Sequence, residues 1–234
     1  MKYIRLMIPF AALLALATSC KKDADLVPEE RPFSREFYVE GMLRDYDNTD
    51  KPFEIAVGTQ EDEQYSNLYT NKSAGSLGAY KAIKSEFYGI HGSQPHFTFI
   101  FRQETPAAAG ASANWTKAEL DAFFTPGKVC KIDGTPGNAQ IRHLVNLPGF
   151  SYQKDYATSD GSGINDQLTI TAVEDYSYQL LNVFNSVITL SGKKVSCTFS
   201  AHVQRPIWNI DLQQTEYKPA RIENGKATFF VRAQ

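Results

Sequence analysis

The chain has 234 residues, with 24 basic and 26 acidic side chains and a formal net charge of −2. A protein that binds nucleic acid shows a basic surplus or a basic patch, and this chain shows neither. Its length is sufficient for a full hydrophobic core without help from metals. Single all-β domains commonly reach about 200 residues, so we expect one folded domain over residues 33–234 and no nucleic-acid partner.

The first nineteen residues predict an export signal. Lys2 and Arg5 form a basic start, residues 6–17 are apolar apart from one proline, and Thr18 and Ser19 are small. A basic start, an apolar stretch of roughly 7–15 residues and a small-residue cleavage site characterise a secretory signal peptide. The apolar stretch is shorter than the about 20 residues that a membrane-spanning helix needs.

A cysteine follows the small residues directly. The segment Leu16-Ala17-Thr18-Ser19-Cys20 resembles the lipobox of bacterial lipoproteins. The resemblance implies that the Cys20 thiol receives diacylglycerol, that the signal is cut just before it, and that acyl chains such as palmitate hold the protein on a membrane. The alternative is a plain signal peptide with an incidental cysteine. Residues 1–19 hold two basic and no acidic residue, so the mature chain keeps 22 basic and 26 acidic side chains and a net charge of −4.

Residues 20–32 predict a solvated tether. They are rich in charge, contain Pro28 and Pro32, and show no sustained apolar period, which favours an extended, unfolded segment. Charged residues after the cysteine also resemble lipoproteins of the Bacteroidetes type, where they can direct export to the cell surface. This resemblance implies an outer-membrane location, facing either the periplasm or the cell surface.

Period-2 alternation dominates residues 33–234 and predicts strands with one face in a core and one near water. Phe97, Phe99 and Phe101 share one face of such a segment. The predicted strands cover residues 37–43, 52–57, 79–83, 96–102, 128–132, 140–145, 167–173, 186–190, 194–203, 206–212 and 226–232. Ser191-Gly192-Lys193 and Asn224-Gly225 predict hairpin turns between strands. Many short strands with such turns predict an all-β fold, an antiparallel sandwich or a flattened barrel.

One short helix near residues 117–124 interrupts this pattern. Thr116-Lys117-Ala118-Glu119 is a capping box, and an apolar stripe at helical spacing begins at Leu120. Pro126-Gly127 ends the helix. A second helical turn near residues 178–184 is an alternative, which the strand that follows disfavours.

Cys130 and Cys197 remain once Cys20 is acylated. Exported proteins fold where disulfides persist, and a bond between these two would close a loop of about 68 residues and contribute on the order of 4 kcal/mol. The alternative is two separate buried thiols that act as small hydrophobic side chains.

No metal motif is complete. The histidines lack the spacings of a zinc site, and we interpret them as surface residues: His91, His96, His143 and His202. Asp45-Tyr46-Asp47-Asn48-Thr49-Asp50 resembles the start of a calcium loop, but its sixth position is Asp50 and its twelfth is Ala56, where an EF-hand needs Gly and Glu. A polar hairpin tip explains the segment as well. We therefore expect no cofactor, with calcium as the alternative.

Catalytic motifs are also missing from the sequence. It contains no Gly-x-Ser-x-Gly segment and no glycine-rich loop that joins a strand to a helix. Aromatic side chains beside loops and strand ends offer a different function, because they can stack on sugar rings. The candidates are Trp208, Tyr176 and Tyr178. The alternative is that these residues belong to the core, where aromatic side chains are common in β-proteins.

Three C-terminal segments resemble a pattern in uncharacterised Bacteroidetes lipoproteins: Leu168-Thr169-Ile170-Thr171, residues 195–201 and residues 222–229. The chain departs from that pattern at Ser196-Cys197, where Gly is usual. The resemblance implies a fold and a location but no activity. The leading hypothesis is a non-catalytic, lipid-anchored envelope protein that binds a glycan or a partner protein. The alternatives are an envelope hydrolase with a carboxylate pair and a structural subunit of an envelope assembly.

Overall fold

The structure is a computed structural model. It describes residues 36–47, 49–56, 62–71, 80–89, 96–104, 114–146, 153–158, 166–181 and 187–233. Residues Ser34–Gln234 form one compact unit, distinct from Met1–Phe33. The expected signal peptide, the lipid-modified Cys20, the tether and His91 all lie outside the described residues.

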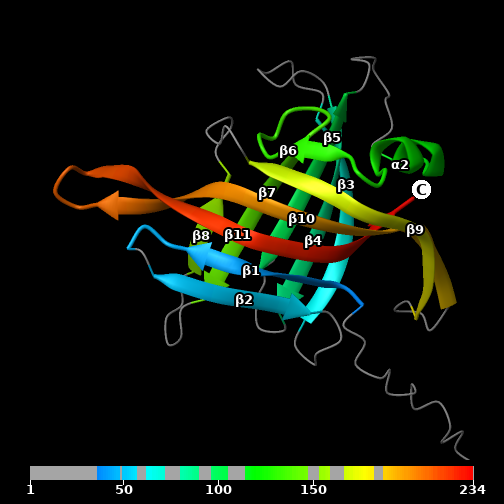
Figure 1. Ribbon diagram of the computed structural model, residues 1–234, viewed down its shortest axis with the longest axis horizontal. Coiled ribbons are helices and arrows are strands. Elements are labelled where there is room, and N and C mark those ends of the chain that lie inside the picture. The colour runs from blue at the N-terminus through cyan, green and yellow to red at the C-terminus, as the bar shows by residue number, and fades with distance from the viewer. Residues whose placement is uncertain are drawn as a thin grey trace, which may run out of the picture. The chain divides into compact units, whose positions relative to one another are not determined.

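The described unit is an antiparallel all-β fold with one short helix, which confirms the predicted fold class (Figure 1). Its elements in chain order are β1 (Tyr38–Arg44), β2 (Asp50–Ala56), β3 (Asp62–Asn71), β4 (Tyr80–Gly89), β5 (Phe97–Glu104), α2 (Lys117–Phe123), β6 (Val129–Lys131), β7 (Ala139–Asn146), β8 (Gln153–Ala157), β9 (Gln167–Leu181), β10 (Val187–Asn209) and β11 (Gln214–Arg232). In the described part of the chain, no helix is long and apolar enough to cross a membrane.

The strands form one branched sheet with the order β2-β1-β11-β10-β8-β7-β5-β4-β3. One edge of β10 has two neighbours. Its residues 187–200 pair with β9, which in turn pairs with β6, whereas Gln204 pairs with Ala157 of β8. The long strands β10 and β11 are therefore the shared spine of both branches.

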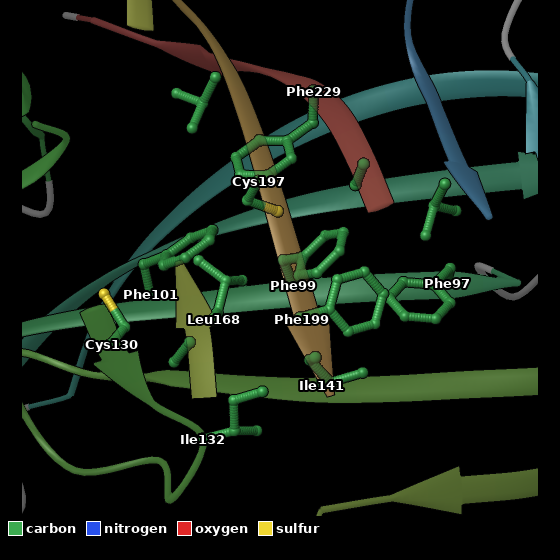
Figure 2. Close-up of a cluster of buried hydrophobic side chains, with 14 of the residues drawn as sticks. Phe97, Phe99, Phe101, Cys130, Ile132, Ile141, Leu168, Cys197, Phe199 and Phe229 are labelled. Carbon is green, nitrogen blue, oxygen red and sulfur yellow. The ribbon is translucent and has the colours of Figure 1, made fainter. Parts of the chain in front are cut away.

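The sheet curls so that its inner face packs on itself (Figure 2). Three strands lie between β5 and β11 in the sheet order, yet the ring centroids of Phe99 and Phe229 are only 5.1 Å apart. The ring centroids of Phe97 and of Phe199 in β10 are likewise 5.7 Å apart. Phe97, Phe99 and Phe101 are fully buried and share the core, as their alternation predicts. Burial of the hydrophobic core, to which this aromatic cluster belongs, is the main favourable term in folding.

The predicted hairpin at Ser191-Gly192-Lys193 is wrong, because β10 runs straight through it. Gly192 pairs with Arg232 of β11 and with Tyr176 of β9. A Cβ at Gly192 would lie 2.0 Å from the carbonyl oxygen of Val231. The glycine therefore permits a close approach of two backbones and does not mark a turn. Strand β9 is also longer than predicted, and its course to Leu181 excludes a helical turn from residue 178 to that point.

Asn224-Gly225 does not form the predicted turn either. Both residues lie inside β11, where Asn224 has a φ of 54° and the pairing with β10 shifts between Phe199 and Ala201. The positive φ that an Asn-Gly hairpin requires serves a β-bulge at this position. The ring of Phe199 covers Gly225, since a Cβ there would meet the ring at 2.6 Å.

Helix α2 confirms the predicted capping box. The Thr116 hydroxyl accepts from the backbone N–H of Glu119, and the Glu119 carboxylate accepts from that of Thr116. The helix buries Leu120 and Phe123, and the Phe123 ring contacts Phe101 in the core. Lys81 of β4 also pairs with Glu119. These contacts fix the helix against the curled sheet.

Candidate functional site

The hairpin of β10 and β11 extends beyond the rest of the sheet. The last lateral pairings in the described residues are Gln204 with Ala157 of β8 and Arg221 with Arg44 of β1. Beyond them, residues 205–218 form a two-stranded ribbon that projects in Figure 1, at the left of the view. We call residues 205–218 the arm.

Two aromatic side chains stand on one face of the arm. Trp208 is 60% exposed and Tyr217 is 64% exposed. Trp208 pairs with Thr215 and Pro206 pairs with Tyr217, so the two aromatics are diagonal neighbours, within reach of one another across the ribbon. The structure thus rejects the core interpretation of Trp208. We call Trp208 and Tyr217 the aromatic platform.

The tip of the arm is apolar and held by hydrogen bonds. Ile210 is 79% exposed and Leu212 is 58% exposed. The Asn209 side-chain oxygen accepts from the backbone N–H of Asp211 at 3.0 Å and from that of Leu212 at 3.1 Å. The tip therefore presents two large aliphatic side chains on a fixed turn.

Tyr176 and Tyr178 lie far from Trp208. Tyr176 pairs with Gly192, about sixteen residues before Trp208, which is roughly 50 Å along an extended strand. Both rings pack edge-on against Phe230, and Tyr176 also packs against Phe37. The two tyrosines are half-buried members of a separate aromatic cluster, so the structure does not bring the three sequence-predicted ligand residues together.

A hollow of about 330 Å³, lined mostly by polar residues, lies over β9, β10 and β11. Alternation along β10 places Thr198 and Ser200 on the outer face, because Cys197, Phe199 and Ala201 are buried on the inner one. We call this feature the outer hollow. The side chains that line it are Gln167, Thr169, Thr198, Ser200, Asn224 and Lys226, with Phe199 and Gly225 at the bulge.

A second hollow, of about 260 Å³, adjoins an ion-pair network between α2 and the sheet. Lys193 pairs with Asp121 and Asp175, and Lys117 also donates to Asp175 at 2.8 Å. Hydrogen bonds lower the pKa of Asp175 to about 2, with the larger contribution from Lys117 and a smaller one from Lys193. A hydrogen bond from Lys193 also lowers the pKa of Asp121. A glycosidase needs one carboxyl group that keeps its proton near neutral pH, so this acidic pair does not suit the hydrolase hypothesis.

The carboxylates of the proposed calcium loop have other partners. Asp45 is buried and accepts from the Tyr156 hydroxyl at 2.7 Å, Asp47 accepts from Thr49, and Asp50 pairs with Arg44. Burial raises the pKa of Asp45, but its hydrogen bonds outweigh that effect and hold the pKa below its usual value. Within the described ranges, no three His, Cys, Asp or Glu side chains gather as a metal site. Asp45, Asp47 and Thr49 are thus joined by hydrogen bonds as in a polar hairpin tip.

The histidines differ in environment. His143 is buried, which corrects the prediction of a surface residue, and burial lowers its pKa to about 4. Its ring packs against Phe53, with the two ring centroids 4.5 Å apart. His202 is half-exposed beside the outer hollow, and its Nδ1 lies 2.7 Å from the buried Asp166.

Cys130 and Cys197 are two separate free thiols, both buried, and Figure 2 shows them apart in the core. β6 and β10 flank β9 on opposite sides, so about two strand spacings, roughly 10 Å, separate their backbones. A disulfide needs Cα atoms within about 7 Å. Cys130 and Cys197 therefore do not form a disulfide in this fold. Burial raises the pKa of both thiols.

The fold defines an antiparallel β-domain with a projecting aromatic arm. No family model, curated protein or solved structure matches the chain. Its function must therefore be inferred from its own residues. Tyr217 is the site residue that sequence reasoning missed, because no strand was predicted across residues 214–225. The signal was present in the alternation of Thr215 and Tyr217 with Glu216 and Lys218.

Proposed function

We propose that this protein is a lipid-anchored component of the outer membrane whose β-domain binds a glycan without catalysing a reaction. The observation that carries the proposal is the aromatic platform, Trp208 and Tyr217, exposed on one face of the arm. Cys20 and the expected tether support the anchored location through their resemblance to lipoprotein export signals.

Packing within the domain does not explain the platform. Large aromatics commonly bury 150–250 Å² each, whereas these two rings are mostly in water. A two-stranded ribbon alone is marginally stable and offers no core in which these rings could be buried. Apolar rings that such a ribbon exposes to water therefore mark a surface for interaction. Flat, rigid rings with one wet face suit the C–H face of a sugar. Thr215, directly across from Trp208, adds a hydroxyl for a polar contact.

The test is saccharide binding by residues 33–234, measured by calorimetry and affinity electrophoresis with soluble β-glucan, α-glucan, xylan and mannan. We expect Trp208→Ala and Tyr217→Ala each to weaken binding by about 1 kcal/mol, roughly fivefold, as loss of an aromatic contact typically does. Trp208→Phe should retain most of the affinity. Val187→Ala, at an exposed apolar position off the arm, is the matched control. Equal binding by wild type and Trp208→Ala, or no binding to any of the four, would reject the proposal.

The tip of the arm favours a second candidate, a protein partner within an envelope assembly. Ile210 and Leu212 are aliphatic, offer no flat ring to a sugar, and are among the most exposed apolar residues described. Apolar anchors of this kind dominate protein interfaces when a partner pocket covers them. If this candidate is correct, Ile210→Ser with Leu212→Ser abolishes crosslinking to an envelope protein while saccharide binding is unchanged. An identical crosslinking pattern in the variant and the wild type would exclude it.

A further inference from the structure

We propose that the outer hollow is a second saccharide-binding site. It hydrogen-bonds the hydroxyl groups of one sugar unit in the same saccharide chain that the aromatic platform binds. The ligand class rests on the proposed function. The location and chemistry of the hollow rest on separate residues, so each can fail without the other.

Strand pairing aligns polar side chains across the hollow. Thr198 of β10 pairs with Thr169 of β9 on one side and with Lys226 of β11 on the other, and Ser200 pairs with Gln167. These residues come from three consecutive strands, and they form two adjacent rows on one face. Neighbouring strands are about 4.8 Å apart, a spacing at which several groups can contact one small polar ligand.

The β-bulge shapes the hollow. At Asn224 the pairing of β11 with β10 shifts between Phe199 and Ala201, and the positive φ of Asn224 interrupts the regular pleat. The bulge adds the Asn224 side chain to the lining of the hollow. Bulges often re-aim a side chain in this way next to binding sites.

The hydrogen-bonding groups of the hollow are largely unused within the protein. Among the described residues, none of its five neutral side chains hydrogen-bonds to another protein group, in contrast to Ser196 and Thr228 on the next row, whose hydroxyls are 2.9 Å apart. The Lys226 side chain is 59% exposed, and its amine lies 3.8 Å from the Glu40 carboxylate. The five are Gln167, Thr169, Thr198, Ser200 and Asn224. Amides and hydroxyls both donate and accept, which is the chemistry that a polyhydroxylated ligand requires.

The hollow and the platform share one face of β10. Trp208 lies ten positions after Thr198, an even step along the strand, and the buried residues between them, Phe199, Ala201 and Val203, occupy the opposite face. The ten residues correspond to about 33 Å of strand. A saccharide long enough to span this distance contacts both sites, and the second contact becomes intramolecular once the first has formed. Affinity should therefore rise steeply once the saccharide reaches that length.

The experiment measures the affinity of oligosaccharides of graded length, prepared from the same four polysaccharides, by calorimetry. Thr169→Val with Thr198→Val removes two hydroxyls while keeping the side-chain shape and the β-branched character of the strands. We expect about tenfold weaker binding of the longest oligosaccharides, because each lost hydrogen bond weakens binding about two- to tenfold, and unchanged binding of the shortest. Thr189→Val, on an exposed part of β10 outside the hollow, is the control. Gln167→Ala provides a second variant, and thermal melts verify folding.

The outcomes separate this inference from the proposed function. If Trp208→Ala weakens binding and the threonine variants and Gln167→Ala have no effect, the hollow is rejected and the platform stands. If the hollow variants weaken binding and Trp208→Ala does not, the platform is rejected and the hollow stands. If affinity does not depend on saccharide length, the proposal that one saccharide chain contacts both sites is overturned. If no saccharide binds in any of these measurements, both proposals are overturned.

Discussion

His143 is an ionisable side chain inside an aromatic core. Its ring packs against both Phe53 and Phe97, with ring centroids 4.5 and 5.3 Å away. Its Nδ1 is 3.0 Å from the carbonyl oxygen of His96, and since a carbonyl can only accept, Nδ1 carries the proton of the neutral ring. A protonated ring would leave a buried charge with no carboxylate in hydrogen-bonding contact among the described residues, so burial favours the neutral form.

Acid should therefore destabilise the fold through His143. Its pKa is about 4 in the folded protein against an ordinary 6.5, so between these values the unfolded chain binds a proton that the folded one excludes. The contribution of the neutral ring is fully present above pH 6.5 and is lost as the pH falls towards 4, at a cost on the order of 3 kcal/mol.

The measurement is the pH dependence of the free energy of unfolding by urea, for the wild type and for His143→Gln. The glutamine is neutral throughout and can still donate to the His96 carbonyl. We expect a smaller loss of stability on acidification in the variant, although both proteins lose some as carboxylates such as Asp45 titrate. Identical slopes in the two proteins would show that His143 is not held neutral by burial.

At the scale of elements, glycines illustrate why local signals are ambiguous. Gly192 and Asn224-Gly225 have the sequence character of hairpin turns, but both lie within long strands. Gly192 allows the backbones of β10 and β11 to approach closely, and Gly225 lies beneath the Phe199 ring. Each requirement comes from a residue on a neighbouring strand, so the residues flanking the glycine along the chain do not reveal it.

The arm is an element that the domain should not need for stability. It has no lateral strand among the described residues, and most of its apolar side chains are exposed. Arg205 and Lys218 are cross-strand partners, so joining them through Asn-Gly shortens the hairpin with a favourable type I′ turn.

We expect this shortened protein to lose less than about 1 kcal/mol of stability, equivalent to about 2–4 °C in the unfolding temperature of a domain of this size. Saccharide binding at the aromatic platform should be lost. Calorimetric melting and the binding assay measure both effects. A much larger fall in the melting temperature would mean that the arm packs against the domain and is not a free projection.

At the scale of the whole molecule, curling of the sheet decides which residues meet. Phe99 and Phe229 become neighbours across the core although they are 130 residues apart in the sequence. The same long strands carry Tyr176 and Trp208 to distant ends of the outer face. The aromatic residues that appeared equivalent in the sequence therefore divide into a half-buried cluster and an exposed platform, and only the latter is a candidate ligand surface.

The sequence by itself determined the local features: period-2 alternation predicted the strands and the inward face of Phe97, Phe99 and Phe101, and the capping box predicted α2. These depend on residues within a few positions of one another. The tertiary structure alone decided that three predicted segments join as β10, that His143 is buried, and that Tyr217 stands beside Trp208. These outcomes depend on pairing between distant strands, whose register is set by burial of the whole core and not by any local propensity.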